Sequence, residues 1–430
     1  MTGESTVVIR PAKNIAGSLR LPGDKSISHR YAMLGAIAQG TTRLENFATG
    51  ADCASTLRCL RDLGVEWERV ENAVLIQGCG TKLRAAKATL DCGNSGSTMR
   101  MLSGILAGQE FTSELSGDES LRRRPMARII SPLEQMGARI VAAESGRPPL
   151  RITGGDLRSI DYKMPAASAQ VKSALLFAGL FAKGETRVQE PVQTRDHGEV
   201  ALRAFGAEVG QNGLEARIAG GQGLHAIETT IPGDISSAAF FLCAAALFPG
   251  SQLVITDLLM NPTRARLLDV QACMGIDLRV TQLEERHGEL AGMVQVEGRG
   301  LKGIVIAGSD TAALIDEIPV LAAIAPFTSE GVEVRDAKEL RVKESDRIAA
   351  IALNLRKMGA KVEEREDGLK IPGGQQLHGA EVDSQGDHRI AMAFAIAALR
   401  AEGETMIHGA DAAVISYPGF FQALEAVAHR

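Results

Sequence analysis

The sequence predicts a two-domain α/β protein in which helices are buried and β-sheets face outward. Three observations lead to this prediction. A polar residue followed by an apolar helix recurs six times, these helices are apolar on nearly every face, and a β-rich stretch follows each of them. A helix that is apolar all round is normally buried, so the strands that follow it are expected to lie outside it.

The repeated units are long. The buried helices are predicted to start at Asp24, Asn94, Ser168, Asp234, Asp316 and Asp387, which are 66 to 82 residues apart. Thin solenoids repeat every 20–50 residues or so, so six units of this size fit two domains of three units better. In five units a second, amphipathic helix follows, as in "ASTLRCLRDLG", and a further strand comes after it.

Composition excludes several classes of protein. The net charge of −5 and the aromatic content of 4% argue against a nucleic-acid surface, which needs a basic face and stacking rings. None of the six cysteines forms a C-x-x-C pair and no H-E-x-x-H is present, so no metal or redox motif is predicted. Apolar runs are too short for a membrane span and no signal peptide is recognisable, which favours a cytoplasmic protein.

Polar residues at the start of the buried helices have two interpretations. Asp, Asn and Ser are preferred N-caps, and this role is predicted for all six starts. Capping does not explain the cations beside them, because Lys and Arg normally favour the other end of a helix. These cations are Lys25, Arg30, Arg100, Lys172 and Arg389. Together with helix N-termini they predict a cleft that binds a ligand with at least two anionic groups.

Seven motifs in the chain resemble signatures of the EPSP synthase family, and they occur in the family's order. They are "PGDKSISHR", "GNSGSTMR", "RRRPM", "SAQVKSALL", "TRDHGE", "RVKESDR" and "DHRIAM". The resemblance implies a two-domain inside-out α/β barrel with six βαβαββ repeats, three per domain. It places residues 22–235 in one domain with repeats one to three. Residues 1–21 and 236–430 form the other, with repeats four to six.

The resemblance also implies an activity. Members transfer the enolpyruvyl group of phosphoenolpyruvate to the 5-hydroxyl of shikimate 3-phosphate and release phosphate, in the shikimate pathway to chorismate. No metal and no organic cofactor is implied. The expected partners are these two small substrates, with no nucleic acid and no membrane, and the chain is expected to be a cytoplasmic monomer. Glyphosate is expected to compete with phosphoenolpyruvate.

The resemblance assigns one set of residues to shikimate 3-phosphate. The set comprises Lys25, Ser26, Arg30, Ser168, Ala169, Gln170, Arg195, Asp316 and Lys343. Ala169 stands where some members have a second serine, so one hydroxyl contact is missing. Arg195 stands where some relatives have a shorter polar side chain, and it can compensate by gripping the phosphate.

A second set is assigned to phosphoenolpyruvate. It comprises Lys25, Asn94, Gly96, Arg124, Gln170, Arg347 and Arg389. Three guanidinium groups can hold both the carboxylate and the phosphate of one small dianion, because Arg makes bidentate contacts. Arg122 and Arg123, which precede Arg124, are read as part of a solvated charge run.

Three residues are the catalytic candidates that the resemblance implies. Asp316 would take the proton of the 5-hydroxyl, although it could also simply cap a helix. Either Glu344 or Lys25 would protonate the methylene carbon of phosphoenolpyruvate, and the sequence leaves this choice open. Glu344 could instead only pair with Lys343 or Arg347. Positioned proton transfer commonly contributes about 10²–10⁴-fold to a rate.

One departure and two rival interpretations remain. Ile415 stands where some relatives carry a lysine that reaches phosphoenolpyruvate. UDP-N-acetylglucosamine enolpyruvyl transferases share the fold, but they typically have Lys-Asn at Lys25-Ser26 and a cysteine near Glu119. Both differences favour shikimate 3-phosphate. A non-catalytic anion-binding repeat protein would explain the caps and cations, but it would not require Asp316 or Glu344.

Overall fold

The structure is a computed structural model that describes residues 5–430. Residues 1–4, where the predicted segment 1–21 begins, lie outside the described residues. Two compact units divide the chain. Among the described residues, unit 1 comprises 5–22, 233–284 and 290–430, and unit 2 comprises 23–232 and 285–289. The chain therefore leaves unit 1 after its first strands and returns to it after residue 232.

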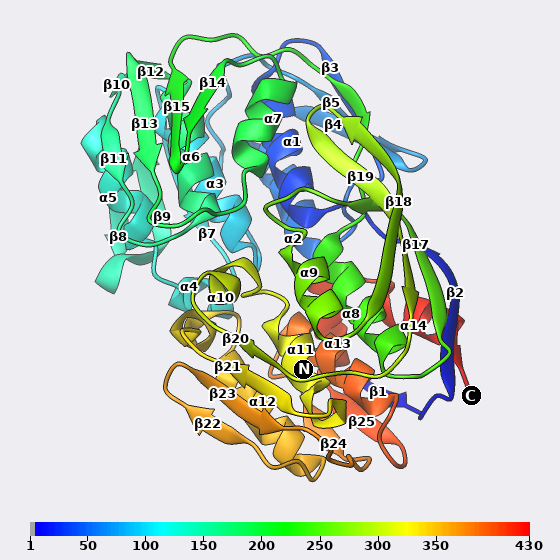
Figure 1. The fold of residues 1–430 in the computed structure, drawn as a ribbon. Helices are drawn as coiled ribbons and strands as arrows, with labels where there is room; N and C mark the ends of the chain where they lie inside the picture. The colour runs from blue at the N-terminus through cyan, green and yellow to red at the C-terminus, as the bar shows by residue number, and fades with distance from the viewer. Residues whose placement is uncertain (1–4) are drawn as a thin grey trace. The chain divides into compact units, whose positions relative to one another are not determined.

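Three long helices form the interior of unit 2. They are α1 (Lys25–Ile37), α3 (Gly96–Ala107) and α6 (Ala169–Gly179). Nearly all of their residues are buried, as their apolar sequences predict, and α3 packs against both α1 and α6 (Figure 1). Amphipathic helices follow each of them, namely α2 (Ala51–Asp62), α5 (Ala127–Met136) and α7 (His197–Ala204).

Three four-stranded sheets in unit 2 share one topology. In two of them the strand before a buried helix pairs in parallel with the strand after it. In the remaining sheet, residues 228–230, which lie at the end of segment 23–232 rather than before α1, pair in parallel with the strand that follows α1. Two antiparallel strands complete each sheet. The first is β16 (Glu228–Thr230), β3 (Thr41–Glu45), β5 (Ala73–Gln77) and β4 (Glu66–Val70). The second is β6 (Leu90–Asp91), β7 (Thr112–Ser116), β9 (Arg147–Thr153) and β8 (Arg139–Ala143). The third is β11 (Asp161–Lys163), β13 (Glu185–Gln189), β15 (Glu215–Ala219) and β14 (Val209–Asn212).

Unit 1 also has three buried apolar helices. They are α8 (Ile235–Ala246), the shorter α11 (Ile318–Ala323) and α13 (His388–Ala398), and α13 packs against both of the others. Every residue of α8 is buried. Amphipathic partners are α9 (Arg266–Cys273), α12 (Arg347–Lys357) and, at the C-terminus, α14 (Phe420–Val427).

The sheets of unit 1 use both ends of the chain. One sheet repeats the four-strand topology, with β20 (Ile304–Ile306), β21 (Gly331–Val334), β23 (Gly368–Pro372) and β22 (Glu363–Arg365). A second contains β18 (Asp277–Arg286), β19 (Glu289–Glu297), β17 (Gln252–Leu259), β2 (Asn14–Arg20) and β26 (Ala428–His429). A third contains β1 (Thr6–Ile9), β25 (Thr405–His408) and β24 (Glu381–Asp383).

The predicted N-caps are confirmed at four of the six helices and are wrong at two. Asp24, Ser168, Asp234 and Asp387 each accept a hydrogen bond from a backbone N–H of the first turn. At α3 the cap is Ser95 rather than Asn94, because the Ser95 hydroxyl accepts from the Thr98 N–H. At α11 the cap position is Glu317 rather than Asp316, and it makes no side-chain cap bond.

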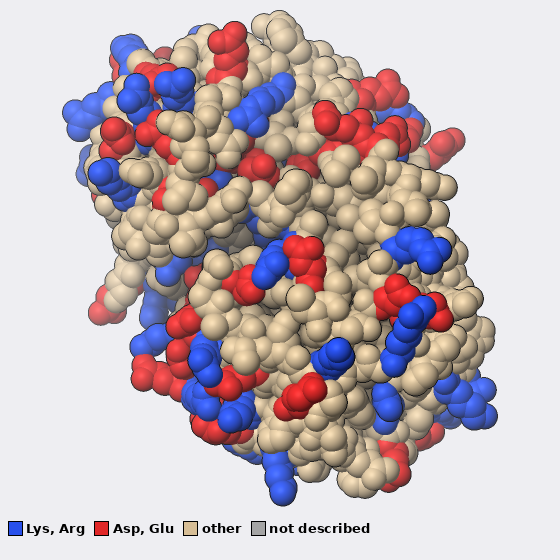
Figure 2. Space-filling view, viewed as in Figure 1, with Lys and Arg blue, Asp and Glu red and all other residues tan. Residues whose placement is uncertain are grey.

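Charges of both signs are mixed on the surface. Figure 2 shows Lys and Arg side chains interspersed with Asp and Glu on the face that it draws, in keeping with the small net charge of −5. Among residues 5–430, no helix combines the length and the apolar character that crossing a bilayer requires.

Candidate active site

The start of α1 places Lys25 against a carboxylate. The Lys25 ammonium lies 3.1 Å from Asp52 Oδ2, and Asp52 belongs to the first turn of α2. One turn further along α1, His29 is fully buried and its Nδ1 lies 2.7 Å from Thr56 Oγ1. Burial, together with the charges of Lys25 and Arg30, holds the pKa of His29 well below its ordinary value. The imidazole is therefore neutral, and Lys25 and Arg30 are the cations of this helix end.

Arg30 connects the start of α1 to the start of α6. Its Nε and Nη2 donate to the Ser173 hydroxyl at 3.1 and 2.9 Å, and its Nη1 donates to the Ser26 carbonyl at 2.8 Å. Its Nη2 also donates to the Ala169 carbonyl at 3.4 Å. Burial lowers the pKa of Arg30 to about 10, so it stays charged at neutral pH. A buried guanidinium consequently lies beside two of the residues assigned to the sugar phosphate.

The start of α3 is surrounded by guanidinium groups. Arg124 is buried, and its Nη2 donates to Asn94 Oδ1 at 2.9 Å. Arg100 Nη1 donates to Gln170 Oε1 at 2.7 Å, and Gln170 Nε2 donates to Ser97 Oγ at 2.8 Å. These bonds join the first turn of α3 to the first turn of α6.

Unit 2 therefore gathers most of its predicted site residues. Arg30, Arg100 and Gln170 tie the first turns of α1, α3 and α6 to one another. Arg122 and Arg123 are exposed, as the solvated charge run predicts, whereas Arg124 is buried. Three helix N-termini with cationic side chains make an anion site from backbone and side chain alike.

In unit 1, Arg347 lies among three carboxylates. Its Nε is 2.8 Å from Asp387 Oδ2, its Nη2 is 2.7 Å from Glu344 Oε2, and its Nη1 is 3.7 Å from Asp316 Oδ1. Arg389 Nη1 donates to the Asp316 carbonyl at 2.7 Å, and its Nη2 lies 3.7 Å from Asp316 Oδ2. Of the two arginines assigned to phosphoenolpyruvate, Arg347 thus contacts both Asp316 and Glu344, and Arg389 contacts Asp316.

These contacts fix the charge state of Arg347 and Asp387. Burial alone would lower the pKa of Arg347, but Asp387, Glu344 and Asp316 outweigh it and raise that pKa. Burial would likewise raise the pKa of Asp387, and Arg347 outweighs it, so that pKa is lowered. Among the described residues Arg347 Nη1 is buried and has no hydrogen-bond partner, which leaves one charged donor for an anionic ligand.

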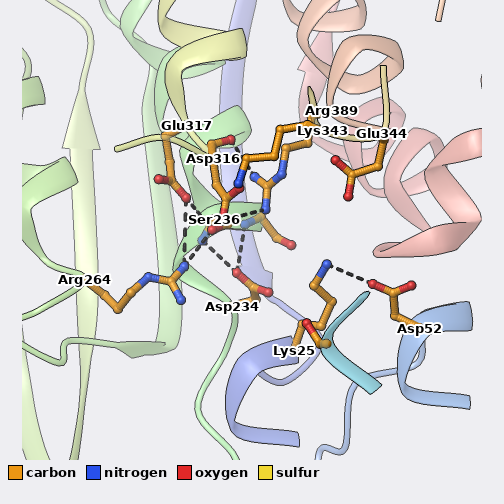
Figure 3. A network of polar contacts seen from close by, with 12 residues as sticks. Lys25, Asp52, Asp234, Ser236, Arg264, Asp316, Glu317, Lys343, Glu344 and Arg389 are labelled. Atoms are coloured by element: carbon orange, nitrogen blue, oxygen red, sulfur yellow. Dashed lines mark hydrogen bonds and ion pairs between the residues drawn. The ribbon is translucent and has the colours of Figure 1, made fainter. Parts of the chain in front are cut away.

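A second polar network in unit 1 supports Asp316. Arg264 Nη2 donates to Ser236 Oγ at 2.6 Å, and Ser236 Oγ donates to Glu317 Oε1. Figure 3 shows Arg264 and Glu317 pointing toward Ser236, which follows Asp234 at the start of α8. All three side chains are buried. The residue directly after Asp316 is therefore held by its side chain, while Arg389 holds the Asp316 carbonyl.

Lys343 and Ile415, which the sequence analysis singled out in unit 1, lie outside the Arg347 cluster of ion pairs. The ammonium group of Lys343 lies 3.3 Å from Glu339 Oε1, and it is partly exposed. Ile415 ends the short helix η4 (Ala410–Ile415). Since Ile415 carries no charge, this position supplies no cation.

Several side chains that contact or adjoin the predicted site residues were not identified from the sequence. Asp52, Asp387 and Glu317 pair with or adjoin predicted site residues, and no motif distinguished them from ordinary helix-start acids. Lys172 differs from the expectation that it adds positive field, because its ammonium contacts two buried carboxylates. The only sequence signal for this pairing was a lysine in an otherwise apolar helix, which normally needs a partner.

The fold and these contacts define a class of protein. It is a two-unit α/β protein with buried arginines at the starts of apolar helices, and with carboxylates beside one of them, as expected for an enzyme acting on small polyanions. A family model described as EPSP synthase (3-phosphoshikimate 1-carboxyvinyltransferase) matches residues 9–424. The chain belongs to the EPSP synthase family.

Relatives match over the whole length. A 3-phosphoshikimate 1-carboxyvinyltransferase of Koribacter versatilis is 59% identical over 99% of this chain and 100% of that protein. One of Solibacter usitatus is 56% identical over 98% of this chain and 99% of that protein. A solved structure of EPSP synthase from Acinetobacter baumannii is 42% identical, with a TM-score of 0.88 over 99% of this chain and 98% of the other. The predicted family and the two-domain α/β fold are confirmed.

Proposed function

We infer that this chain transfers the enolpyruvyl group of phosphoenolpyruvate to the 5-hydroxyl of shikimate 3-phosphate and releases phosphate. The observation that carries this function is the cluster of Arg347 with Glu344 and Asp316. It offers a dianion a cation whose buried Nη1 makes no hydrogen bond among the described residues, beside two carboxylates for proton transfer. The full-length match to the family supplies the identity of the two substrates.

The reaction proposed for these residues is addition followed by elimination. Asp316 takes the proton of the 5-hydroxyl, whose oxygen bonds to the central carbon of phosphoenolpyruvate. Glu344 or Lys25 supplies a proton to the methylene carbon, which becomes a methyl group. The C–O bond to phosphate then breaks, the methyl group returns its proton, and the double bond of the enol ether forms. Paired arginines stabilise the anionic groups throughout.

Binding roles follow the two sets of residues. Lys25, Ser26, Arg30, Arg195 and the first turn of α6 would hold shikimate 3-phosphate, and Lys343 and Asp316 would complete its contacts. Asn94, Gly96, Arg124, Gln170, Arg347 and Arg389 would hold phosphoenolpyruvate. The contacts of Arg30 with Ser26 and of Arg124 with Asn94 support this division, because each joins a buried cation to another residue of the same set.

The finer fold assignment is also a proposal. Each domain would be an inside-out α/β barrel of three βαβαββ repeats, with domain limits at 22–235 and at 1–21 plus 236–430. The sheet topology shared by β16-β3-β5-β4, β6-β7-β9-β8 and β11-β13-β15-β14 supports it. Action as a monomer in the cytoplasm stays a prediction from the sequence.

Phosphate release tests the function. The chain mixed with both substrates should release phosphate stoichiometrically with the enol ether, and either substrate alone should release none. The matched variant is Asp316→Asn, which keeps the shape of the side chain and removes its basic carboxylate. Turnover with UDP-N-acetylglucosamine in place of shikimate 3-phosphate would assign the chain to the rival enolpyruvyl transfer. Binding of both substrates without any phosphate release would favour the non-catalytic interpretation.

A further inference from the structure

A buried ion cluster in unit 2 includes a side chain from the first turn of α6. The Lys172 ammonium is 2.8 Å from Glu190 Oε2 and 2.7 Å from Glu199 Oε1. The three residues are 2%, 5% and 1% exposed. They join three elements, since Lys172 is in α6, Glu190 follows β13 and Glu199 is in the first turn of α7. No role in the reaction described above uses these charges.

The cluster holds both ends of segment 190–196, which carries Arg195. At the start of the segment, Glu190 accepts hydrogen bonds from the Thr194 hydroxyl and from the Thr194 N–H. At its end the cluster holds α7 through Glu199, which lies in the first turn of that helix. His197, the first residue of α7, is held separately, because its buried Nδ1 lies 2.6 Å from Glu289 Oε1. Thr194 directly precedes Arg195, so the Glu190 carboxylate fixes the backbone next to that guanidinium.

The charged groups of the ion cluster also act on Arg30, the second guanidinium group that is assigned to shikimate 3-phosphate in this unit. Burial raises the pKa of Glu199 and the Lys172 ammonium opposes this rise, so Lys172 stabilises the charged form of the carboxylates that it contacts. Arg30 senses Glu199 as a favourable charge and Arg195 as an unfavourable one. Arg195 therefore lies within electrostatic range of Arg30, and Glu199 offsets part of the repulsion between these two guanidinium groups.

We propose that Lys172 and Glu190 are positioning residues for the sugar phosphate, because they fix segment 190–196 so that Arg195 faces the phosphate of shikimate 3-phosphate. This inference rests on the proposed function. In this proposal Lys172 does not bind the ligand, because its ammonium is paired with two carboxylates. Arg195 makes the contact with the phosphate instead. Sequence position alone would have placed Lys172 among the direct anion ligands.

Substitutions on the segment itself separate positioning from general packing. Thr194→Val removes one hydroxyl and keeps the shape, so the affinity for shikimate 3-phosphate should fall about fivefold, the usual net worth of one hydrogen bond. Glu190→Gln keeps the shape and removes a charge that accepts several bonds, and here the fall should be about tenfold or more. Calorimetry measures this dissociation constant, and steady-state kinetics gives KM for each substrate separately.

Selectivity is the readout that a purely structural role would not produce. Both variants should raise KM for shikimate 3-phosphate several times more than KM for phosphoenolpyruvate, and Thr194→Ser should restore the wild-type values. In an Arg195→Ala background, Thr194→Val should have almost no further effect, because the residue that it positions is gone. Glu185→Gln is the matched control, since Glu185 begins β13, the strand that Glu190 follows, and its ion pair is with the exposed Arg187.

The outcomes are separable. Wild-type protein that does not bind shikimate 3-phosphate contradicts the proposed function. Wild-type binding with unchanged affinity in Thr194→Val and Glu190→Gln overturns the positioning role while the function stands. Equal rises of KM for both substrates, or an undiminished Thr194→Val effect without Arg195, also overturn it. If Glu190→Gln does not fold, Thr194→Val decides alone, because it leaves the ion cluster intact.

Discussion

Gly96→Ala should change ligand selection far more than it changes stability. A Cβ at Gly96 would lie 3.0 Å from Arg100 Nη1 and 3.4 Å from Arg124 Nη1, with no backbone atom among its nearest neighbours. Both contacts are far ends of flexible side chains, so a shift of a few tenths of an ångström relieves them. Gly96 is the first residue of α3 and its φ is not in the left-handed region, so alanine fits the backbone.

The magnitude follows from two opposing effects on folding. Moving Arg100 weakens its 2.7 Å bond to Gln170, which is worth about 1 kcal/mol. Alanine in place of glycine favours the helix by up to about 1 kcal/mol. The free energy of unfolding should therefore change by less than about 1 kcal/mol, which is a shift in Tm of at most about 4 °C.

For ligands that bind beside Gly96, no gain in helix stability offsets the cost of the added methyl group. An added methyl in a close-packed site costs about 1–3 kcal/mol when its neighbours are held, and a bound anion holds both guanidinium groups. Glyphosate is longer than phosphoenolpyruvate and has less room to shift. Its inhibition constant should rise by about tenfold or more, and KM for phosphoenolpyruvate should rise by a smaller factor.

Steady-state inhibition and thermal unfolding of wild type and Gly96→Ala measure both effects. Gly104→Ala is the contrasting variant on the same helix, because its Cβ would lie 2.1 Å from the Ala174 carbonyl oxygen in α6. That clash involves backbone, so Gly104→Ala should lose more than about 1–3 kcal/mol of stability. Equal weakening of glyphosate and phosphoenolpyruvate by Gly96→Ala would refute the reasoning, and so would wild-type protein that is already insensitive to glyphosate.

Three further predictions concern charge. Asp316→Asn and Glu344→Gln should still bind shikimate 3-phosphate by calorimetry and lose about 10²-fold or more in turnover, and near-normal turnover would remove that residue from the catalytic set. Arg347→Lys should raise KM for phosphoenolpyruvate about tenfold or more, because an ammonium cannot replace the planar fork, and an unchanged KM in steady-state assays would contradict this. His29 has a lowered pKa when folded, so the unfolded chain takes up its proton first and stability should fall as pH drops below 6.5. Denaturant titrations between about pH 5 and 7.5 should show this slope, at most about 1.4 kcal/mol per pH unit, and its persistence in His29→Gln would contradict the assignment.

Periodicity and helix-start chemistry were enough to predict the buried helices. Because α1 and α8 are apolar on nearly every face, they were expected to be buried, and Asp24 and Asp234 cap them as expected. The error at α3 has a local cause. Asn94 and Ser95 are both good caps, and sequence does not say which one has the extended backbone that the cap position requires.

The sequence did not predict which residues far apart in the chain would form ion pairs or hydrogen bonds. Arg347 was assigned to a ligand by resemblance, but its bond to Asp387 joins residues 40 positions apart and depends on tertiary packing. The same holds for Lys172 with Glu190 and for Arg264 with Ser236. Composition can say that a buried lysine or arginine needs a partner, but only the packing of the helices determines which carboxylate or hydroxyl it meets.

The pairing of both chain ends within unit 1 constrains the order of events during synthesis. Strand β2 lies between β17 and β26, and β1 pairs with β25. Strand β1 must therefore wait for residues 405–408, whereas β2 can pair with β17 once residues 252–259 have been made. Unit 2 is almost continuous, from residue 23 to 232, so it can become compact while the chain is still growing. A nascent chain stopped before residue 405 would contain a largely folded unit 2 and a β1 strand without its partner. Such an unpaired strand is prone to aggregation, so it is a suitable segment for a chaperone to bind.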